Sequence, residues 1–282
     1  MFRKILSLIV VLLLICLSAC SFAFSDGSES VSISDTSAAA SAPTYASNPT
    51  EPWICETTAA NLSLPLESGS HLLRYTDKNT TDYLDYYLFI PNNAEINMPL
   101  IVFLHGDGEV GNVGALENYG MMIRAREIYG ENFPFIALFP CTRVYSWTED
   151  SVPETLFGLI ESTAEELTVD RRRIIITGHS RGAMGTWNMI STYGDYFSAA
   201  VPVSCGTEVN LNYSMCAQVP VLAFAGTYGE AEVNYQNAMR CVIENLLDAG
   251  SDAELVLLQG CAHGDTCEEA YTEETFRWML EQ

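Results

Sequence analysis

The chain has 282 residues, and its 13 lysines and arginines face 36 aspartates and glutamates, which gives a formal net charge of −23 at pH 7. A surface that binds nucleic-acid phosphates needs clustered positive charge, so this balance argues against a nucleic-acid partner. Hydrophobic residues make up 48% of the chain, which is enough for the core of one large domain.

The first 19 residues have the pattern of an export signal. Arg3 and Lys4 provide a positive start, and the apolar run that follows is shorter than the roughly 20 residues of a membrane span. The run ends in Leu-Ser-Ala followed by Cys20, which resembles a bacterial lipobox, where the cysteine becomes the lipid-modified first residue. We therefore expect a lipoprotein signal peptide at 1–19, with ordinary secretion as the alternative.

A polar segment separates this signal from the rest of the chain. Residues 20–50 are rich in serine, alanine and threonine, include Pro43 and Pro49, and show no apolar periodicity. This composition predicts a flexible tether, which would let a lipid-anchored domain stand away from a membrane. Residues 51–282 are then expected to form a single domain outside the cytoplasm.

In the remaining chain, short apolar runs alternate with amphipathic segments. The apolar runs predict strands at 71–75, 85–91, 99–104, 135–139, 173–177, 199–203, 219–225 and 253–258. Helical spacing predicts helices at 152–167, 183–190, 231–247 and 267–282. Repeated strand–helix units predict an α/β fold with a mostly parallel central sheet and helices on both faces. Active sites in such sheets lie at the carboxyl ends of the strands.

One pentapeptide, Gly178-His179-Ser180-Arg181-Gly182, lies between the strand at 173–177 and the helix at 183–190. A strand, a sharp turn with serine at its tip and a helix form the context of a G-x-S-x-G nucleophile elbow. Glycines two residues to either side avoid collisions with the neighbouring strand and helix. Ser180 is therefore the predicted nucleophile.

A serine nucleophile needs a base, and the chain has four histidines. His71 lies in the first strand, His105 belongs to a His-Gly turn whose backbone matters more than its side chain, and His179 is adjacent to the serine and points away from it. The remaining candidate, His263, follows the last strand and is the only histidine after Ser180. Because the triad order in this context is serine, acid, histidine, His263 is the predicted base.

The acid that orients the base should follow the strand at 219–225, or less often the preceding strand. No aspartate occurs in the segment from Ala225 to Glu232. Glu230 is therefore the predicted acid, with Glu232 as the second candidate and Glu208, after the preceding strand, as the third.

Two backbone N–H groups are predicted to stabilise an oxyanion. The first belongs to Arg181, directly after the serine, and the second to Asp107, in the turn His105-Gly106-Asp107-Gly108. No Cys-x-x-Cys pair or clustered histidine spacing is present, so neither a metal site nor a cofactor is expected.

An exported chain can form disulfides, although sequence does not give their connectivity. Two pairings are considered. Cys261 with Cys267 would stiffen the segment around His263, and Cys205 with Cys216 would constrain the loop after the strand at 199–203.

With these residues in view, the chain resembles the α/β-hydrolase superfamily. It is most similar to small secreted esterases of the dienelactone-hydrolase, polyhydroxybutyrate-depolymerase and feruloyl-esterase type, grouped with prolyl-oligopeptidase-like hydrolases. The motifs that carry the resemblance between Tyr87 and Gln282 are Pro99–Gly106, Val169–Arg171, Gly178–Gly182, Gly185–Trp187, Ala200–Ser204, His263 and Phe276–Leu280. The resemblance implies an acyl-enzyme mechanism at a serine without a metal.

The chain departs from this family at three places. Arg181 stands where a hydrophobic residue or glutamine is usual, and Ala183 replaces a second glycine. The usual His-Gly-x-x-Asp segment is replaced by 225–229, with Glu230 one place beyond. The expected activity is hydrolysis of carboxylic esters in extracellular material such as acylated polysaccharide, with no large lid over the site. The alternatives are a peptidase of the same fold and a noncatalytic surface-binding lipoprotein with a degenerate triad.

Overall fold

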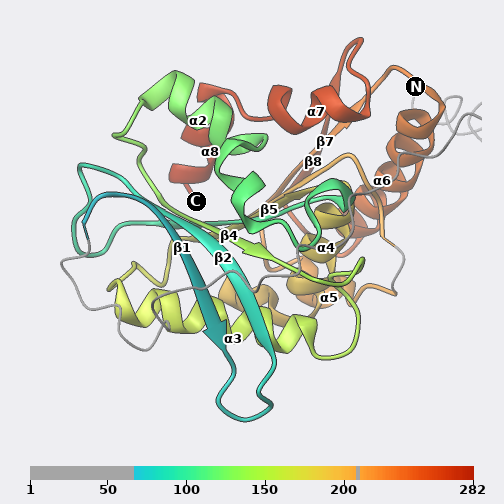
Figure 1. Ribbon diagram of the computed structural model, residues 1–282. Helices are drawn as coiled ribbons and strands as arrows, with labels where there is room; N and C mark the ends of the chain where they lie inside the picture. The colour runs from blue at the N-terminus through green and yellow to red at the C-terminus, as the bar shows by residue number, and fades with distance from the viewer. Residues whose placement is uncertain (1–66, 208–209) are drawn as a thin grey trace, which may run out of the picture. The chain divides into compact units, whose positions relative to one another are not determined.

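The computed structural model describes residues 67–207 and 210–282. The predicted signal peptide, the tether, Cys20 and Glu208 lie outside these residues. The described residues contain one eight-stranded sheet with the order β1-β2-β4-β3-β5-β6-β7-β8 (Figure 1). Its strands are β1 (Gly69–Thr76), β2 (Tyr83–Ile90), β3 (Leu100–Leu104), β4 (Ile136–Cys141), β5 (Ile174–His179), β6 (Ala199–Val203), β7 (Val221–Gly226) and β8 (Ala253–Leu258).

Strand direction follows the predicted pattern. β1 and β2 run antiparallel to each other, and β2 runs antiparallel to β4. Along the sheet from β4 through β3, β5, β6 and β7 to β8, each strand is parallel to the next. The predicted mostly parallel sheet is confirmed, and each of the eight predicted strands is present within a few residues of its expected bounds.

Helices cover both faces of this sheet (Figure 1). They are α2 (Met121–Tyr129), α3 (Val152–Glu166), α4 (Arg181–Tyr193), α5 (Tyr213–Cys216), α6 (Glu230–Asp248), α7 (His263–Glu269) and α8 (Glu273–Leu280), with short 3-10 turns η2 (Asp107–Glu109), η3 (Val113–Asn118) and η4 (Gly194–Tyr196). Buried side chains of α3, α4 and α6 fill the core on one face, and those of α2 and α8 fill the core on the other. In the described part of the chain, no helix combines the length and the apolar character needed to cross a membrane.

The two core layers explain why the central strands are continuously apolar. All five residues of β3 are buried. Leu100, Val102 and Leu104 contribute to one layer, whereas Ile101 and Phe103 contribute to the other. Because successive residues of a strand face opposite sides, a strand covered on both faces needs an apolar residue at every position.

Three helical features differ from the predictions. Neither α2 nor the short helix α5 is predicted from the sequence. The single helix predicted at 267–282 is two helices, α7 and α8, and the first begins at His263 rather than at Cys267. Tyr271 lies in the break between them, and its buried hydroxyl is 2.7 Å from Thr177 Oγ1. Thr272 then starts α8 by accepting the Thr275 N–H at 3.2 Å, so a cap and a buried anchor end the first helix where periodicity alone predicts continuation.

The two disulfides considered above do not form. Among the described residues, Cys141, Cys216, Cys241, Cys261 and Cys267 are free thiols. Cys267 lies on the buried side of α7, directly against Gly120, whereas Cys261 is half-buried ahead of that helix. Cys205 and Cys216 are each buried. Cys267 therefore points into the core, and Cys261 does not share this buried position.

The elbow after β5 depends on the absence of a side chain at two glycines. A Cβ at Gly182 would overlap the carbonyl oxygen of Leu104, and a Cβ at Gly178 would overlap the backbone of Gly182. Between them Ser180 has a φ of 57°, a left-handed conformation that is strained for a non-glycine residue. The Ser180 N–H donates to the carbonyl oxygen of Val203 at 2.9 Å, which ties the elbow to the end of β6.

We expect Gly182→Ala to destabilise the fold by about 3 kcal/mol, because the new methyl group would force α4 away from β3. For a domain of this size that corresponds to a melting temperature lower by roughly 6–12 °C, measurable by circular dichroism. Gly114→Ala is the matched control, since a Cβ there would meet only Asn112 Oδ1 at 3.9 Å. Equal melting temperatures for the two variants would contradict the close packing of the elbow.

Candidate active site

Ser180 and His263 meet at the carboxyl edge of the sheet. Ser180 follows β5, and His263 begins α7 after β8. The Ser180 Oγ lies 2.9 Å from His263 Nε2, and His263 Nδ1 lies 2.6 Å from Glu232 Oε1. The three side chains therefore form a continuous hydrogen-bonded chain from a hydroxyl through an imidazole to a carboxylate.

The acid predicted from the sequence, Glu230, is not part of this chain. Glu230 is the first residue of α6 and is exposed, whereas Glu232 is only 1% exposed. Positions two apart on an α-helix point in directions about 200° apart, so these two glutamates cannot share a face. The geometry corrects the first choice and assigns the contact with His263 to the second candidate. Glu208, the third, lies outside the described residues.

The spacing of the apolar residues in α6 indicates from the sequence that Glu232 faces inward. The buried residues of this helix are Glu232, Met239, Val242, Ile243 and Leu246. Steps of seven, four and three residues connect Glu232 with Met239, Ile243 and Leu246, which is the spacing of one helical face. Extending the apolar face of the predicted helix back to its first turn selects position 232 rather than 230.

The Glu232 carboxylate accepts hydrogen bonds at both oxygens. Oε1 faces His263, while Oε2 accepts the Gly226 N–H at 2.6 Å and lies 3.0 Å from Ser204 Oγ. Burial opposes the charge of this carboxylate, but the hydrogen bonds from His263, Gly226 and Ser204 outweigh burial and leave the pKa of Glu232 below its ordinary value. The group is therefore a carboxylate, rather than a neutral acid, at neutral pH.

The backbone of His263 is fixed by two buried side chains. His179 Nε2 lies 2.9 Å from the carbonyl oxygen of His263, and Thr266 Oγ1 lies 2.8 Å from the same oxygen. The opposite nitrogen of His179 lies 3.2 Å from the hydroxyl of Tyr119. The ring of His263 itself packs between those of His179 and Tyr235, with centroids 4.8 and 5.0 Å away. His179, which is not the predicted base, thus supports His263, which is.

His105 has a structural environment. It is completely buried, with Nδ1 2.6 Å from the Gly106 carbonyl oxygen and Nε2 accepting the Thr142 N–H at 3.1 Å. Burial lowers the pKa of His105 to about 4. Burial, followed by the neighbouring His263, also lowers the pKa of His179 to about 4. Both imidazoles are therefore neutral at pH 7.

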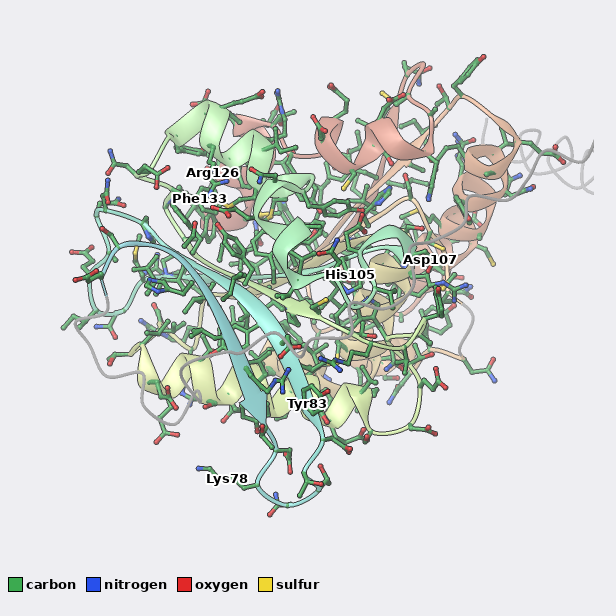
Figure 2. All side chains as sticks on the ribbon, in the orientation of Figure 1. Lys78, Tyr83, His105, Asp107, Arg126 and Phe133 are labelled. Carbon is green, nitrogen blue, oxygen red and sulfur yellow. The ribbon has the colours of Figure 1, made fainter. Side chains whose placement is uncertain are left out.

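The residues of the two predicted N–H donors belong to segments that contact each other. Arg181 is the first residue of α4, so its N–H has no acceptor within the helix. His105 and Asp107, labelled in Figure 2, belong to the turn after β3. A Cβ at Gly106 would lie 3.4 Å from the Ser180 Cβ. The side chains of Arg181 and Asp107 form an ion pair, which connects the two backbone segments.

The sheet order, the elbow and the surrounding helices define an α/β-hydrolase fold. Solved structures with this fold include a thermostable esterase, 24% identical, with a TM-score of 0.67 over 76% of this chain and 63% of that one. Another is an acetyl xylan esterase from Aspergillus awamori, 17% identical, with a TM-score of 0.55 over 73% of this chain and 99% of that one. No family model matches the chain.

The relatives found by sequence are also esterases and depolymerases. The bifunctional acetylxylan esterase/xylanase XynS20E of Neocallimastix patriciarum is 25% identical over 156 residues, covering 54% of this chain and 22% of that protein. The probable acetylxylan esterase A of Aspergillus fumigatus is 27% identical over 166 residues, covering 51% and 43%. Poly(3-hydroxyalkanoate) depolymerase C of Paucimonas lemoignei is 22% identical over 137 residues, covering 44% and 31%.

These matches span less than half the length of each of those relatives. The resemblance to esterases of the dienelactone-hydrolase, polyhydroxybutyrate-depolymerase and feruloyl-esterase type, read from the sequence motifs, is confirmed by these relatives and by the shared fold.

The buried histidines predict a pH dependence of stability. His105 and His179 have pKa values of about 4 in the fold against an ordinary 6.5. Between these values the unfolded chain binds protons that the folded chain does not, so stability falls as pH drops from 6.5 towards 4. Each histidine contributes a slope of about 1.4 kcal/mol per pH unit in this window.

Urea unfolding at several pH values measures this slope. His105→Gln and His179→Asn are each expected to remove about half of it, whatever their effect on stability at pH 7, because each removes one titrating group. An unchanged slope in either variant would show that the corresponding imidazole does not take up its proton on unfolding.

Proposed function

We propose that this chain is a serine esterase that hydrolyses carboxylic esters through an acyl-enzyme intermediate. The observation that carries the proposal is the hydrogen-bonded chain Ser180–His263–Glu232. We further propose the backbone N–H groups of Arg181 and Asp107 as the oxyanion donors, and the ion pair between their side chains supports this choice. Nucleophile, base, orienting carboxylate and oxyanion donors are the parts that acyl transfer requires.

In the first half-reaction, Ser180 Oγ attacks the ester carbonyl while His263 Nε2 takes its proton. The new imidazolium keeps its Nδ1–H on Glu232 Oε1, so the carboxylate stabilises the positive charge without accepting the proton. The N–H groups of Arg181 and Asp107 bind the negative oxygen of the tetrahedral intermediate. The carbon–oxygen bond to the alcohol then breaks, and His263 returns the proton to the departing alkoxide.

In the second half-reaction, water takes the place of the alcohol. His263 Nε2 removes a proton from the water, whose oxygen attacks the acyl carbon of the Ser180 ester. The second tetrahedral intermediate collapses by breaking the bond to Ser180 Oγ, which recovers its proton from His263. The carboxylic acid leaves and the site returns to its starting state.

We expect Glu232→Gln to lower kcat on p-nitrophenyl acetate by about 10³- to 10⁴-fold, because an amide cannot stabilise the imidazolium. Glu230→Gln is the matched control and should stay within about twofold of the wild type, since Glu230 is exposed and two residues away on the same helix.

A fluorophosphonate probe tests the nucleophile independently of substrate choice. It should label the wild type and fail to label Ser180→Ala. Absence of wild-type labelling together with absence of ester hydrolysis would contradict the esterase and favour a noncatalytic binding protein. A larger loss of kcat in Glu230→Gln than in Glu232→Gln would instead contradict the assignment of the acid.

The substrate class we propose is an acylated neutral polysaccharide. Two of the relatives described above bear names that specify acetylxylan esterases, and a solved structure of this fold is an acetyl xylan esterase. The formal charge of −23 favours a neutral polymer, because an anionic polymer would be repelled. A short acyl group on a sugar hydroxyl suits this combination.

Rates on a panel of esters check this proposal. We expect kcat/KM for acetylated xylan or acetylated xylose to exceed that for p-nitrophenyl laurate by about tenfold or more, and peptide substrates to remain uncleaved. The panel should also include feruloyl sugars, because the residues of the site do not identify the acyl group of the substrate. Preference for laurate, or cleavage of peptides, would overturn the polysaccharide proposal while leaving the serine mechanism intact.

We further propose that residues 1–19 form a lipoprotein signal peptide, that Cys20 carries the lipid and that 20–50 tether the hydrolase domain, 51–282, to the outer side of a cell membrane. In a bacterial host, the full chain should fractionate with membranes and incorporate labelled palmitate. Cys20→Ser should lose both properties and retain esterase activity in the soluble fraction. Membrane association that persists in Cys20→Ser would contradict the anchor.

A further inference from the structure

Ser204 has an unusual backbone conformation directly after β6. Its φ is 54°, in the left-handed region that disfavours residues with a side chain. Its N–H donates to the Phe224 carbonyl oxygen at 2.8 Å, which holds this conformation against the end of β7. Glycine or asparagine would adopt this conformation with less strain, so the backbone alone does not account for a serine here.

The side chain of Ser204 is completely buried beside the proposed catalytic acid. Its Oγ lies 3.0 Å from Glu232 Oε2 and 2.6 Å from Thr266 Oγ1. Thr266 belongs to α7, the helix that begins with His263, and is also completely buried. Ser204 therefore connects the carboxylate with the helix that carries the proposed base.

Counting protons gives this small network a direction. Each hydroxyl has one proton, and a carboxylate without a proton can only accept. Thr266 donates its proton to the carbonyl oxygen of His263 at 2.8 Å, so the Ser204 hydroxyl is the donor both to Thr266 Oγ1 and to Glu232 Oε2. Of these two acceptors Glu232 is charged and Thr266 is neutral, and a charged acceptor gains more from a hydroxyl than a neutral one does.

The position of Glu232 makes this contact important for geometry. Its side chain extends from the first turn of α6, one methylene longer than an aspartate on the loop would be. Fixing Oε2 from two sides stops the carboxylate from rotating, which keeps Oε1 at 2.6 Å from His263 Nδ1.

We propose that Ser204 is a positioning residue of this site: its hydroxyl, which also contacts Thr266 Oγ1, holds Glu232 Oε2 so that Oε1 aligns the imidazole of His263. This inference rests on the esterase function proposed above. It adds a residue that neither the elbow motif nor the triad order identifies.

The test uses steady-state kinetics on p-nitrophenyl acetate with Ser204→Ala and Ser204→Gly. Both remove the hydroxyl, but the glycine also relieves the left-handed backbone. We expect both to lower kcat by roughly 10- to 100-fold with KM within about twofold. Ser251→Ala is the matched control, because Ser251 is a buried serine whose hydroxyl has no hydrogen-bond partner among the described residues, and its kcat should not change.

A double-mutant cycle separates positioning from a general structural effect. In the Glu232→Gln background, Ser204→Ala should cost less than about twofold in kcat, because the group that it positions has already been disabled. Thr266→Val should lower kcat less than Ser204→Ala does, since it removes only a second acceptor of the Ser204 hydroxyl and leaves the donor to Glu232 in place. Melting temperatures confirm that each variant is folded.

Three results would overturn the inference while the esterase proposal stands. They are a wild-type kcat in Ser204→Ala, full activity in Ser204→Gly with loss only in Ser204→Ala, and an equal fold-loss for Ser204→Ala in the wild-type and Glu232→Gln backgrounds. A wild-type protein that neither hydrolyses the ester nor reacts with the fluorophosphonate would overturn the esterase proposal and this inference together.

Discussion

A buried carboxylate needs hydrogen-bond donors, and this requirement organises the active-site edge of the molecule. Glu232 is 1% exposed and receives its contacts from three different segments: Gly226 at the end of β7, Ser204 at the end of β6 and His263 at the start of α7. An uncompensated charge at this depth would cost several kcal/mol. The segments after β6, β7 and β8 therefore converge on one side chain, and Glu232 couples their positions to each other.

The serine side of the site is determined by packing rather than by charge. α4 lies so close to β3 that neither Gly178 nor Gly182 has room for a side chain. The elbow also lies close to the turn after β3, where Gly106 faces Ser180. The elbow and the turn after β3 are also connected by the ion pair between the Arg181 and Asp107 side chains. Ser180 and Ser204 both have a positive φ, and they lie at the ends of the neighbouring strands β5 and β6.

The histidines illustrate how burial assigns different roles to one residue type. His105 and His179 are buried, their pKa values are lowered to about 4, and each serves the backbone around it. His263 is more exposed and lies between a hydroxyl and a carboxylate. His179 connects the two sets, because it follows β5 beside Ser180 and contacts the carbonyl oxygen of His263. His179, the variable residue before the serine of the G-x-S-x-G motif, thus supports the backbone of His263.

Local sequence patterns were sufficient for much of this protein. Continuous apolar runs identified the strands because both faces of the sheet are covered, and the glycines around Ser180 identified the elbow because they act through their nearest neighbours in the chain. Helical spacing already indicates position 232 rather than 230, but the contact of Glu232 with His263 is set by the tertiary structure. The contacts made by Ser204 and His179 join residues 28 and 84 positions apart along the chain. Sequence specifies which residue types follow each strand, whereas packing of the helices against the sheet sets which of their side chains face inward.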